Sequence, residues 1–128
     1  MQTMVKFVGE GKYHRKIGIM IRKSLEAGSA TTCCAIHGDG LTSFQYRPTD
    51  STTMLEKKFK INGTEAKLIL EKSGNDYTMK TIHSDGTREK QAIEVDLGSS
   101  VLAGLFICSH NNEKFEQAEF TDIKISKK

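Results

Sequence analysis

Hydrophobic and polar residues alternate with a period of two along most of the chain. This is the pattern of a β-strand that buries one face, and no stretch of helical length keeps a period of 3.6 residues. The predicted strands are 2–7, 16–23, 31–37, 41–47, 54–61, 66–72, 77–83, 91–97 and 115–126. Many short strands separated by turn residues predict an all-β protein, an antiparallel sandwich or barrel. We expect a two-sheet β-sandwich that occupies residues 1–128 as a single domain.

One further segment departs from this alternation. Residues 101–108 (VLAGLFIC) are apolar without a break. A strand that is apolar on both faces is typically covered on both sides by other parts of the protein. The segment is therefore predicted to be a central strand of its sheet.

Residues 34–47 contain the most informative turn. Gly38-Asp39-Gly40 joins two predicted strands, and glycine adopts the positive φ angles of tight turns without steric cost. A phosphate-binding glycine loop would lead into the N-terminus of a helix, whereas here a strand follows. We therefore look for a binding site among the polar residues around this turn, and not for a phosphate cradle.

The composition is that of a soluble globular protein, with 37% hydrophobic and 27% charged residues among 128. The net charge is +3, and the 19 basic residues are scattered. Because they form no stripe with interleaved aromatic residues, we expect no nucleic-acid partner. No stretch approaches the roughly 20 apolar residues of a membrane span, and residues 1–7 lack the pattern of a signal peptide.

The three cysteines, Cys33, Cys34 and Cys108, do not form a metal-binding pattern. CxxC and Cys/His ligand spacings are absent, so we expect no metal and no cofactor. Cys33 and Cys34 are adjacent, so in a strand they face opposite sides and at most one of them can pair with Cys108. We favour buried thiols that act as small hydrophobic residues, with a single disulfide to Cys108 as the alternative.

Candidates for catalysis are weak. A glycosidase needs two carboxylates that flank the scissile bond, roughly 5–5.5 Å apart in a retaining enzyme. Glu94 and Asp96 share a strand face but stand at a strand end without an aromatic residue nearby. In the set Glu113, Glu116 and Glu119, the last two are three residues apart and face opposite sides of a strand. No Gly-x-Ser-x-Gly motif marks a nucleophile, so we assign no catalytic residue, and a Ser/His/Asp or Cys/His arrangement assembled by the fold stays open.

A polar strip on one sheet face is the stronger hypothesis. Gln45 and Arg47 share a face of the strand after the turn, and His37 lies on the strand before it. Arg22 points away from the isoleucines of its own strand, and His110 follows the apolar segment. Planar, multidentate side chains of this kind suit sugar hydroxyls or a carboxylate. We expect these five residues to line a ligand site, and the alternative is a cluster of hydrogen bonds within the protein.

Three motifs, in this order, resemble a known bacterial family: GIMIRKSL at residues 18–25, HGDGLTSFQYR at 37–47 and GLFICSHN at 104–111. Over nearly its whole length the chain resembles the concanavalin A-like (lectin/glucanase) sandwich modules of unknown function. These occur alone, within larger secreted proteins or beside TolB-like propeller repeats. The resemblance implies a jelly-roll sandwich and an extracytoplasmic location, without an agreed activity.

Modules of this family carry one or more strands upstream of the part that resembles residues 4–11. Since this chain starts almost inside that part, the resemblance implies either that the sequence is truncated at its N-terminus or that a sheet edge is open. An open edge invites pairing with another chain, which favours a homodimer.

We expect a non-catalytic β-sandwich binding module, with a glycan as the ligand that its polar strip suits best. A glycoside hydrolase of the same fold and a structural or protein-interaction module are the alternatives. Two carboxylates at glycosidase separation in a groove would favour the hydrolase. An exposed apolar patch without a polar cleft would favour the interaction module.

Overall fold

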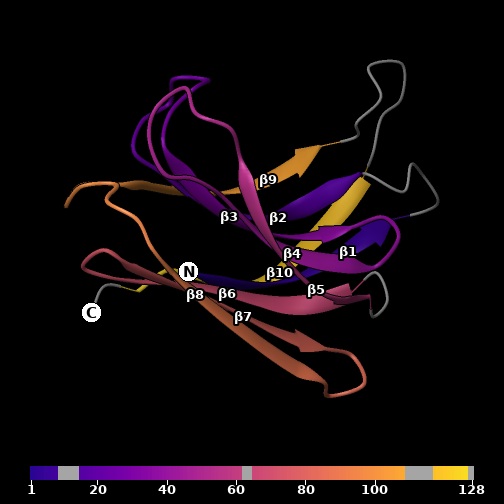
Figure 1. Cartoon of the computed structure of the whole chain (residues 1–128). Helices are drawn as coiled ribbons and strands as arrows, with labels where there is room; N and C mark the ends of the chain where they lie inside the picture. Colours follow the sequence, from indigo (N-terminus) through magenta and orange to yellow (C-terminus); the bar gives the residue numbers. More distant parts are fainter. Residues whose placement is uncertain (9–14, 62–64, 109–116, 127–128) are drawn as a thin grey trace.

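The computed structural model of the chain describes residues 1–8, 15–61, 65–108 and 117–126. These residues form ten β-strands, and none of them is helical. The strands make two antiparallel sheets of five strands each, one packed on the other (Figure 1). The all-β, two-sheet sandwich predicted from the alternation is therefore confirmed. Across the same ranges there is no helix of the length and apolarity needed to cross a membrane.

Each sheet has a defined strand order. Sheet A consists, from edge to edge, of β10 (Gln117–Lys124), β1 (Gln2–Val8), β6 (Glu65–Ser73), β7 (Asp76–His83) and β8 (Arg88–Glu94). Sheet B consists of β5 (Leu55–Ile61), β4 (Leu41–Arg47), β3 (Thr31–His37), β2 (Lys16–Arg22) and β9 (Leu102–Cys108). The four edge strands of the sandwich are thus β10 and β8 in sheet A, and β5 and β9 in sheet B.

The core lies between the sheets because the strands turn alternate side chains inward. On β1, Val5 and Phe7 are buried while Lys6 and Val8 are exposed. Removal of apolar surface from water is the main favourable term in folding. Both sheets contribute to one buried cluster: Val5, Phe7, Ile17, Ile19, Ile21, Ala30, Cys34, Ile36, Phe44, Ala66, Leu68, Leu70, Tyr77, Met79, Ile93, Val95 and Leu97.

The prediction of a central strand at residues 101–108 is wrong. β9 is an edge strand, and it pairs with β2 alone among the described strands. Leu102 and Ile107 are each 46% exposed. A continuous apolar run shows that neither face of a strand is polar, but it does not set how many neighbours the strand has.

The open edge expected near the N-terminal strand lies elsewhere. β1 pairs with β10 on one side and with β6 on the other, so it is an interior strand of sheet A. The position beside β1 is taken by β10, the last strand of the chain (Figure 1). The local pattern of β10 predicted a strand but did not identify its neighbour.

Candidate functional site

Arg22, His37, Gln45 and Arg47 leave the same face of sheet B, on the side away from the core. The register places Arg22 opposite Thr31 and Thr31 opposite Arg47. His37 ends the same strand six residues later. Because side chains alternate between faces, residues an even number apart share a face. Six residues of strand span roughly 20 Å, so the four side chains are spread along the face instead of meeting at one point.

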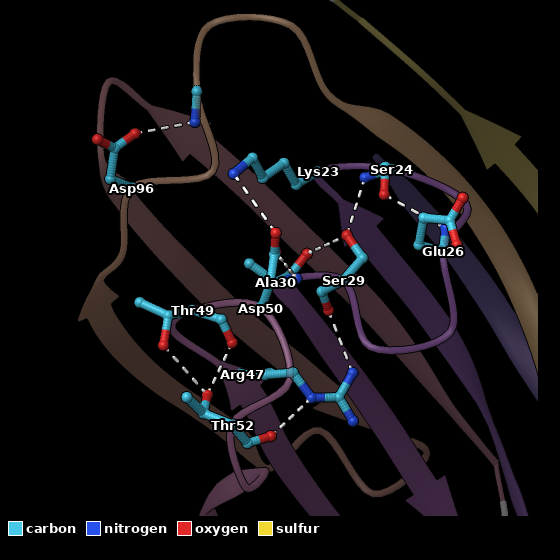
Figure 2. Close-up of polar contacts among 11 residues, drawn as sticks. Lys23, Ser24, Glu26, Ser29, Ala30, Arg47, Thr49, Asp50, Thr52 and Asp96 are labelled. Carbon is cyan, nitrogen blue, oxygen red and sulfur yellow. Dashed lines mark hydrogen bonds and ion pairs between the residues drawn. The ribbon is translucent and has the colours of Figure 1, made fainter.

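Arg47 braces the two loops at one end of sheet B. Its Nε donates to the carbonyl oxygen of Thr52 at 2.9 Å. Its Nη1 donates to the carbonyl oxygens of Ser29 at 3.1 Å and Ala27 at 3.3 Å. Figure 2 shows the guanidinium between the β2–β3 loop and the β4–β5 loop, with its bonds to Ser29 and Thr52. Nε and Nη1 of Arg47 therefore donate their hydrogen bonds within the protein.

Arg22, on β2, braces the β2–β3 loop alone. Its Nε donates to the carbonyl oxygen of Ser24 at 3.0 Å, and its Nη2 donates to that of Glu26 at 2.6 Å. Asp50 adds a link between the same two loops, because its Oδ1 accepts from the backbone N–H of Ala30 at 2.9 Å (Figure 2). The arginine end of the face is thus a loop-bracing cluster, which matches the alternative of hydrogen bonds within the protein.

His37 is hydrogen-bonded to Ser43 on the neighbouring strand. His37 is only 7% exposed, and its Nε2 lies 3.0 Å from Oγ of the fully buried Ser43. Ser43 also helps to lower the pKa of Glu56.

Two hydrogen bonds in series link Lys16 to Glu56 through Gln45. Lys16 donates from Nζ to Oε1 of Gln45 at 3.4 Å, and Gln45 donates from Nε2 to Oε2 of Glu56 at 2.6 Å. These three residues, with Met54 and Leu55, line an open groove of about 280 Å³. That volume is near the lower end of the range for ligand pockets, about 300–1,000 Å³. The groove therefore suits a small ligand or the end of a longer one.

The surroundings of Glu56 keep its carboxyl group charged. Partial burial raises the pKa, but hydrogen bonds from Gln45 and Ser43 and the nearby His37 and Lys58 lower it by more. The net result is a pKa below the ordinary glutamate value of 4.5. Lys58 contributes an exposed ion pair, with Nζ 3.7 Å from Oε1 of Glu56. Glu56 is thus a fixed, oriented acceptor at the groove.

Three small residues lie side by side on the outer face of sheet B. Gly18, Ala35 and Ser43 lie opposite one another on β2, β3 and β4. A Cβ at Gly18 would collide with the backbone carbonyl oxygen of Cys34, so the close approach of β2 and β3 requires glycine here.

The described carboxylates that were weighed for catalysis are either exposed or close a turn. Asp96 accepts from the backbone N–H of Gly98 at 2.9 Å and so closes a turn (Figure 2). Glu94 is exposed on the edge strand β8, and Glu119 is exposed on β10 opposite Lys6. Among the residues that the structure describes, no group of three or more His, Cys, Asp or Glu side chains could hold a metal ion.

Two polar groove residues were not identified from the sequence, namely Lys16 and Glu56. The alternation of side chains along a strand could have identified Lys16, since Lys16 lies six residues before Arg22 on β2 and so shares its face. Glu56 could not be found in this way, because the register between β4 and β5 shifts by one residue within the pair. His110, together with Glu113 and Glu116, lies outside the described residues.

Comparison with known proteins does not add to this description of the groove. No family model matches it, and none of the curated proteins or solved structures is significantly similar to it. The resemblance to concanavalin A-like modules therefore stays a prediction, and an argument about function depends on the groove itself.

All three cysteines are free. Cys33 and Cys34 are buried, as the favoured interpretation predicted, whereas Cys108 is exposed. Cys33 lies opposite Met20, which lies opposite Gly104, so Cys33 and Cys108 are two strands and four positions apart. That separation exceeds the roughly 7 Å between Cα atoms that a disulfide can bridge. The alternative of a disulfide to Cys108 is therefore wrong.

This arrangement predicts selective thiol reactivity. At mildly alkaline pH, a thiol reagent such as DTNB should modify Cys108 in the native protein and spare the other two cysteines. Burial raises the pKa of Cys33 to about 11 and also raises that of Cys34, so both remain protonated and unreactive. One thiol should react in buffer and three in denaturant. Rapid reaction of a second thiol in buffer would contradict the packing of β3.

Proposed function

We propose that this protein is a non-catalytic binding module and that it recognises carbohydrate through the outer face of sheet B. The observation that carries the proposal is the path of hydrogen bonds from Lys16 through Gln45 to Glu56 at an open groove. These bonds fix the side chains before a ligand arrives, which lowers the entropy cost of binding.

The chemistry of the groove suits sugar hydroxyls. A hydroxyl both donates and accepts, and the groove offers a charged acceptor in Glu56 next to donors in Lys16 and Gln45. Charge-assisted hydrogen bonds of this kind are the stronger ones. Met54 and Leu55 supply apolar surface for the C–H groups of a sugar ring. The groove thus combines a few oriented polar groups with an apolar side, as small-molecule sites commonly do.

Binding without catalysis is favoured by the partners of Glu56. A glycosidase sets a second carboxylate beside the first, whereas the side chains that contact Glu56 are Gln45 and Lys58. Ser43 is fully buried, so it is not placed to attack a substrate. A purely structural role is less well supported, because it does not explain a charged acceptor held at an open groove.

The proposal is tested by screening the labelled chain against an array of neutral and acidic oligosaccharides, followed by calorimetry on the best binder. Gln45→Ala should weaken binding about tenfold to a hundredfold, since a hydrogen bond to a charged group contributes about 1.5–3 kcal/mol. Gln2→Ala makes the same change on the outer face of sheet A and should leave the affinity unchanged. Absence of saccharide binding in a folded sample, or equal losses in both variants, would refute the proposal.

The charge of Glu56 also predicts the pH dependence of binding. Affinity should stay constant from neutrality down to the ordinary glutamate pKa of 4.5, and should fall below it as the depressed pKa of Glu56 is crossed. The stability that Glu56 gives the fold follows the same course, being complete above the unfolded-state pKa and lost as the pH falls through the folded-state pKa. Glu56→Gln should bind weakly and remove this step. Calorimetry across the pH range checks it, and a fall in affinity at higher pH would contradict it.

A further inference from the structure

β9 differs from the other edge strands of the sandwich. β5, β8 and β10 all carry charged residues, and β10 also has a register shift against β1 and a positive φ of 52° at Asp122. Charges and irregularities of this kind keep an edge strand from pairing with another chain. β9 has neither, because its seven residues are uncharged and pair with β2 in a regular register throughout.

The outer side of β9 is unpaired among the strands that the structure describes. No strand in the described ranges pairs with β9 on the side away from β2 (Figure 1). In an edge strand, alternate backbone N–H and C=O groups point outward and form a template for a further strand. Leu102 and Ile107 add exposed apolar surface at the two ends of the strand. This edge therefore fits an uncharged extended partner.

We propose that β9 pairs with β9 of a second copy of this chain, antiparallel and centred on Leu105, to form a homodimer. The pairing brings no like charges together. It also matches sizes, since each small side chain of one copy lies opposite a large one of the other: Ala103 with Ile107, Gly104 with Phe106, and Cys108 with Leu102. Cross-strand pairs of this kind are the unit that stabilises a sheet.

Gly104 favours this register over its neighbours. A Cβ at Gly104 would meet nothing within 4 Å, so the single chain leaves an open space on the strand there. In the proposed dimer the ring of Phe106 from the other copy covers that space, in the way that aromatic residues compensate for glycine at sheet edges. A register centred on Gly104 sets two glycines opposite each other, and one centred on Phe106 sets two phenylalanines opposite each other. Each of these registers also leaves two residues of each β9 without a partner.

The register is tested by disulfide trapping. Leu102→Cys places a thiol opposite Cys108 of the other copy, so oxidised glutathione should convert the variant into a covalent dimer on a non-reducing gel. Ala103→Cys, the matched control, lies on the opposite face of the strand and should not cross-link. The double variant Leu102→Cys/Cys108→Ser should not cross-link either. The wild-type chain should stay uncross-linked, because its two Cys108 residues lie at opposite ends of the pairing, and a disulfide between them would overturn the register.

Association itself is tested by sedimentation. The wild-type chain should sediment at twice its mass of 14.3 kDa, in a concentration-dependent manner. Gly104→Lys should be monomeric with an unchanged circular dichroism spectrum, because the open space admits the side chain in one copy but not opposite Phe106. Ala92→Lys, on the exposed edge strand β8, should remain dimeric.

A wild-type chain that is monomeric at every concentration at which it stays soluble would overturn the proposal. So would a Gly104→Lys variant that remains a dimer, or a Leu102→Cys variant that fails to cross-link. These results do not depend on saccharide binding, because the groove is lined from β2, β4 and β5 and not from β9.

Discussion

Replacement of Phe44 by alanine should lower the free energy of unfolding by about 3–5 kcal/mol. Phe44 is fully buried on β4, opposite Cys34 of β3. Its ring packs edge-on against that of Tyr46, with the ring centroids 6.3 Å apart. Loss of the ring removes this contact and leaves a cavity between the sheets. Urea unfolding followed by circular dichroism measures the change.

Phe44→Leu is the matched control for this substitution. It keeps an apolar side chain and most of the volume, so its loss of stability should be clearly smaller. The two variants together separate the cost of a cavity from the cost of losing an aromatic ring. A loss of less than about 1 kcal/mol for the alanine variant would mean that Phe44 does not lie between the sheets, because truncation of a core aromatic residue costs several times more.

Replacement of Arg47 by alanine should lower the free energy of unfolding by about 2–3 kcal/mol, since hydrogen bonds that involve a charged group contribute most. The substitution removes bonds to the carbonyl oxygens of Ala27, Ser29 and Thr52 and so releases two loops at once. Urea unfolding measures the loss. Limited proteolysis should show faster cleavage within those two loops.

Two other variants serve as controls for the Arg47→Ala substitution. Arg88→Ala changes an exposed arginine on the edge strand β8 and should alter stability by no more than about 0.5 kcal/mol. Arg47→Lys keeps the charge but not the planar fork, so its stability should lie between those of the wild type and the alanine variant. The folded Arg47→Ala protein should bind saccharide as well as the wild type does. A tenfold loss of affinity without a loss of stability would restore the ligand-binding role predicted from the sequence.

The strand pattern was predictable because burial is encoded locally. The segments predicted at 31–37 and 41–47 coincide with β3 and β4. The glycine turn between them marks the end of β3 and the start of β4. The segment predicted at 91–97 is displaced, since β8 spans Arg88–Glu94. Val95 and Leu97 are buried beyond the end of the strand. The hydrophobic pattern therefore reports which residues are buried, whether or not they pair in a sheet.

Strand neighbours were not predictable in this way. The position of β9 at an edge, and of β10 beside β1, is decided by contacts between residues far apart in the sequence. An apolar strand can be accommodated at either position, so its composition does not choose between them. The same limit explains why the edge most open to association is β9 and not the N-terminal strand.

The candidate site was predictable in part. The alternation of side chains along each strand correctly places Arg22, His37 and Gln45 on one face. This alternation does not show what each side chain contacts, since the contacts depend on loops whose course is set by the whole fold. Arg22 turned out to hold loop carbonyl oxygens, whereas Gln45 lies at the groove. Glu56 became a candidate only when β5 was seen beside β4.

β9 and the groove belong to the same sheet. Two copies joined edge to edge through β9 are related by a twofold axis perpendicular to that sheet, so both grooves open toward the same side. A polysaccharide or cell surface with repeated units can then engage both at once, which raises the apparent affinity by about a hundredfold or more when the spacing fits. A free monosaccharide gains nothing from this geometry. A weak groove would thus be sufficient for firm attachment to a repetitive polymer while leaving soluble sugars largely unbound.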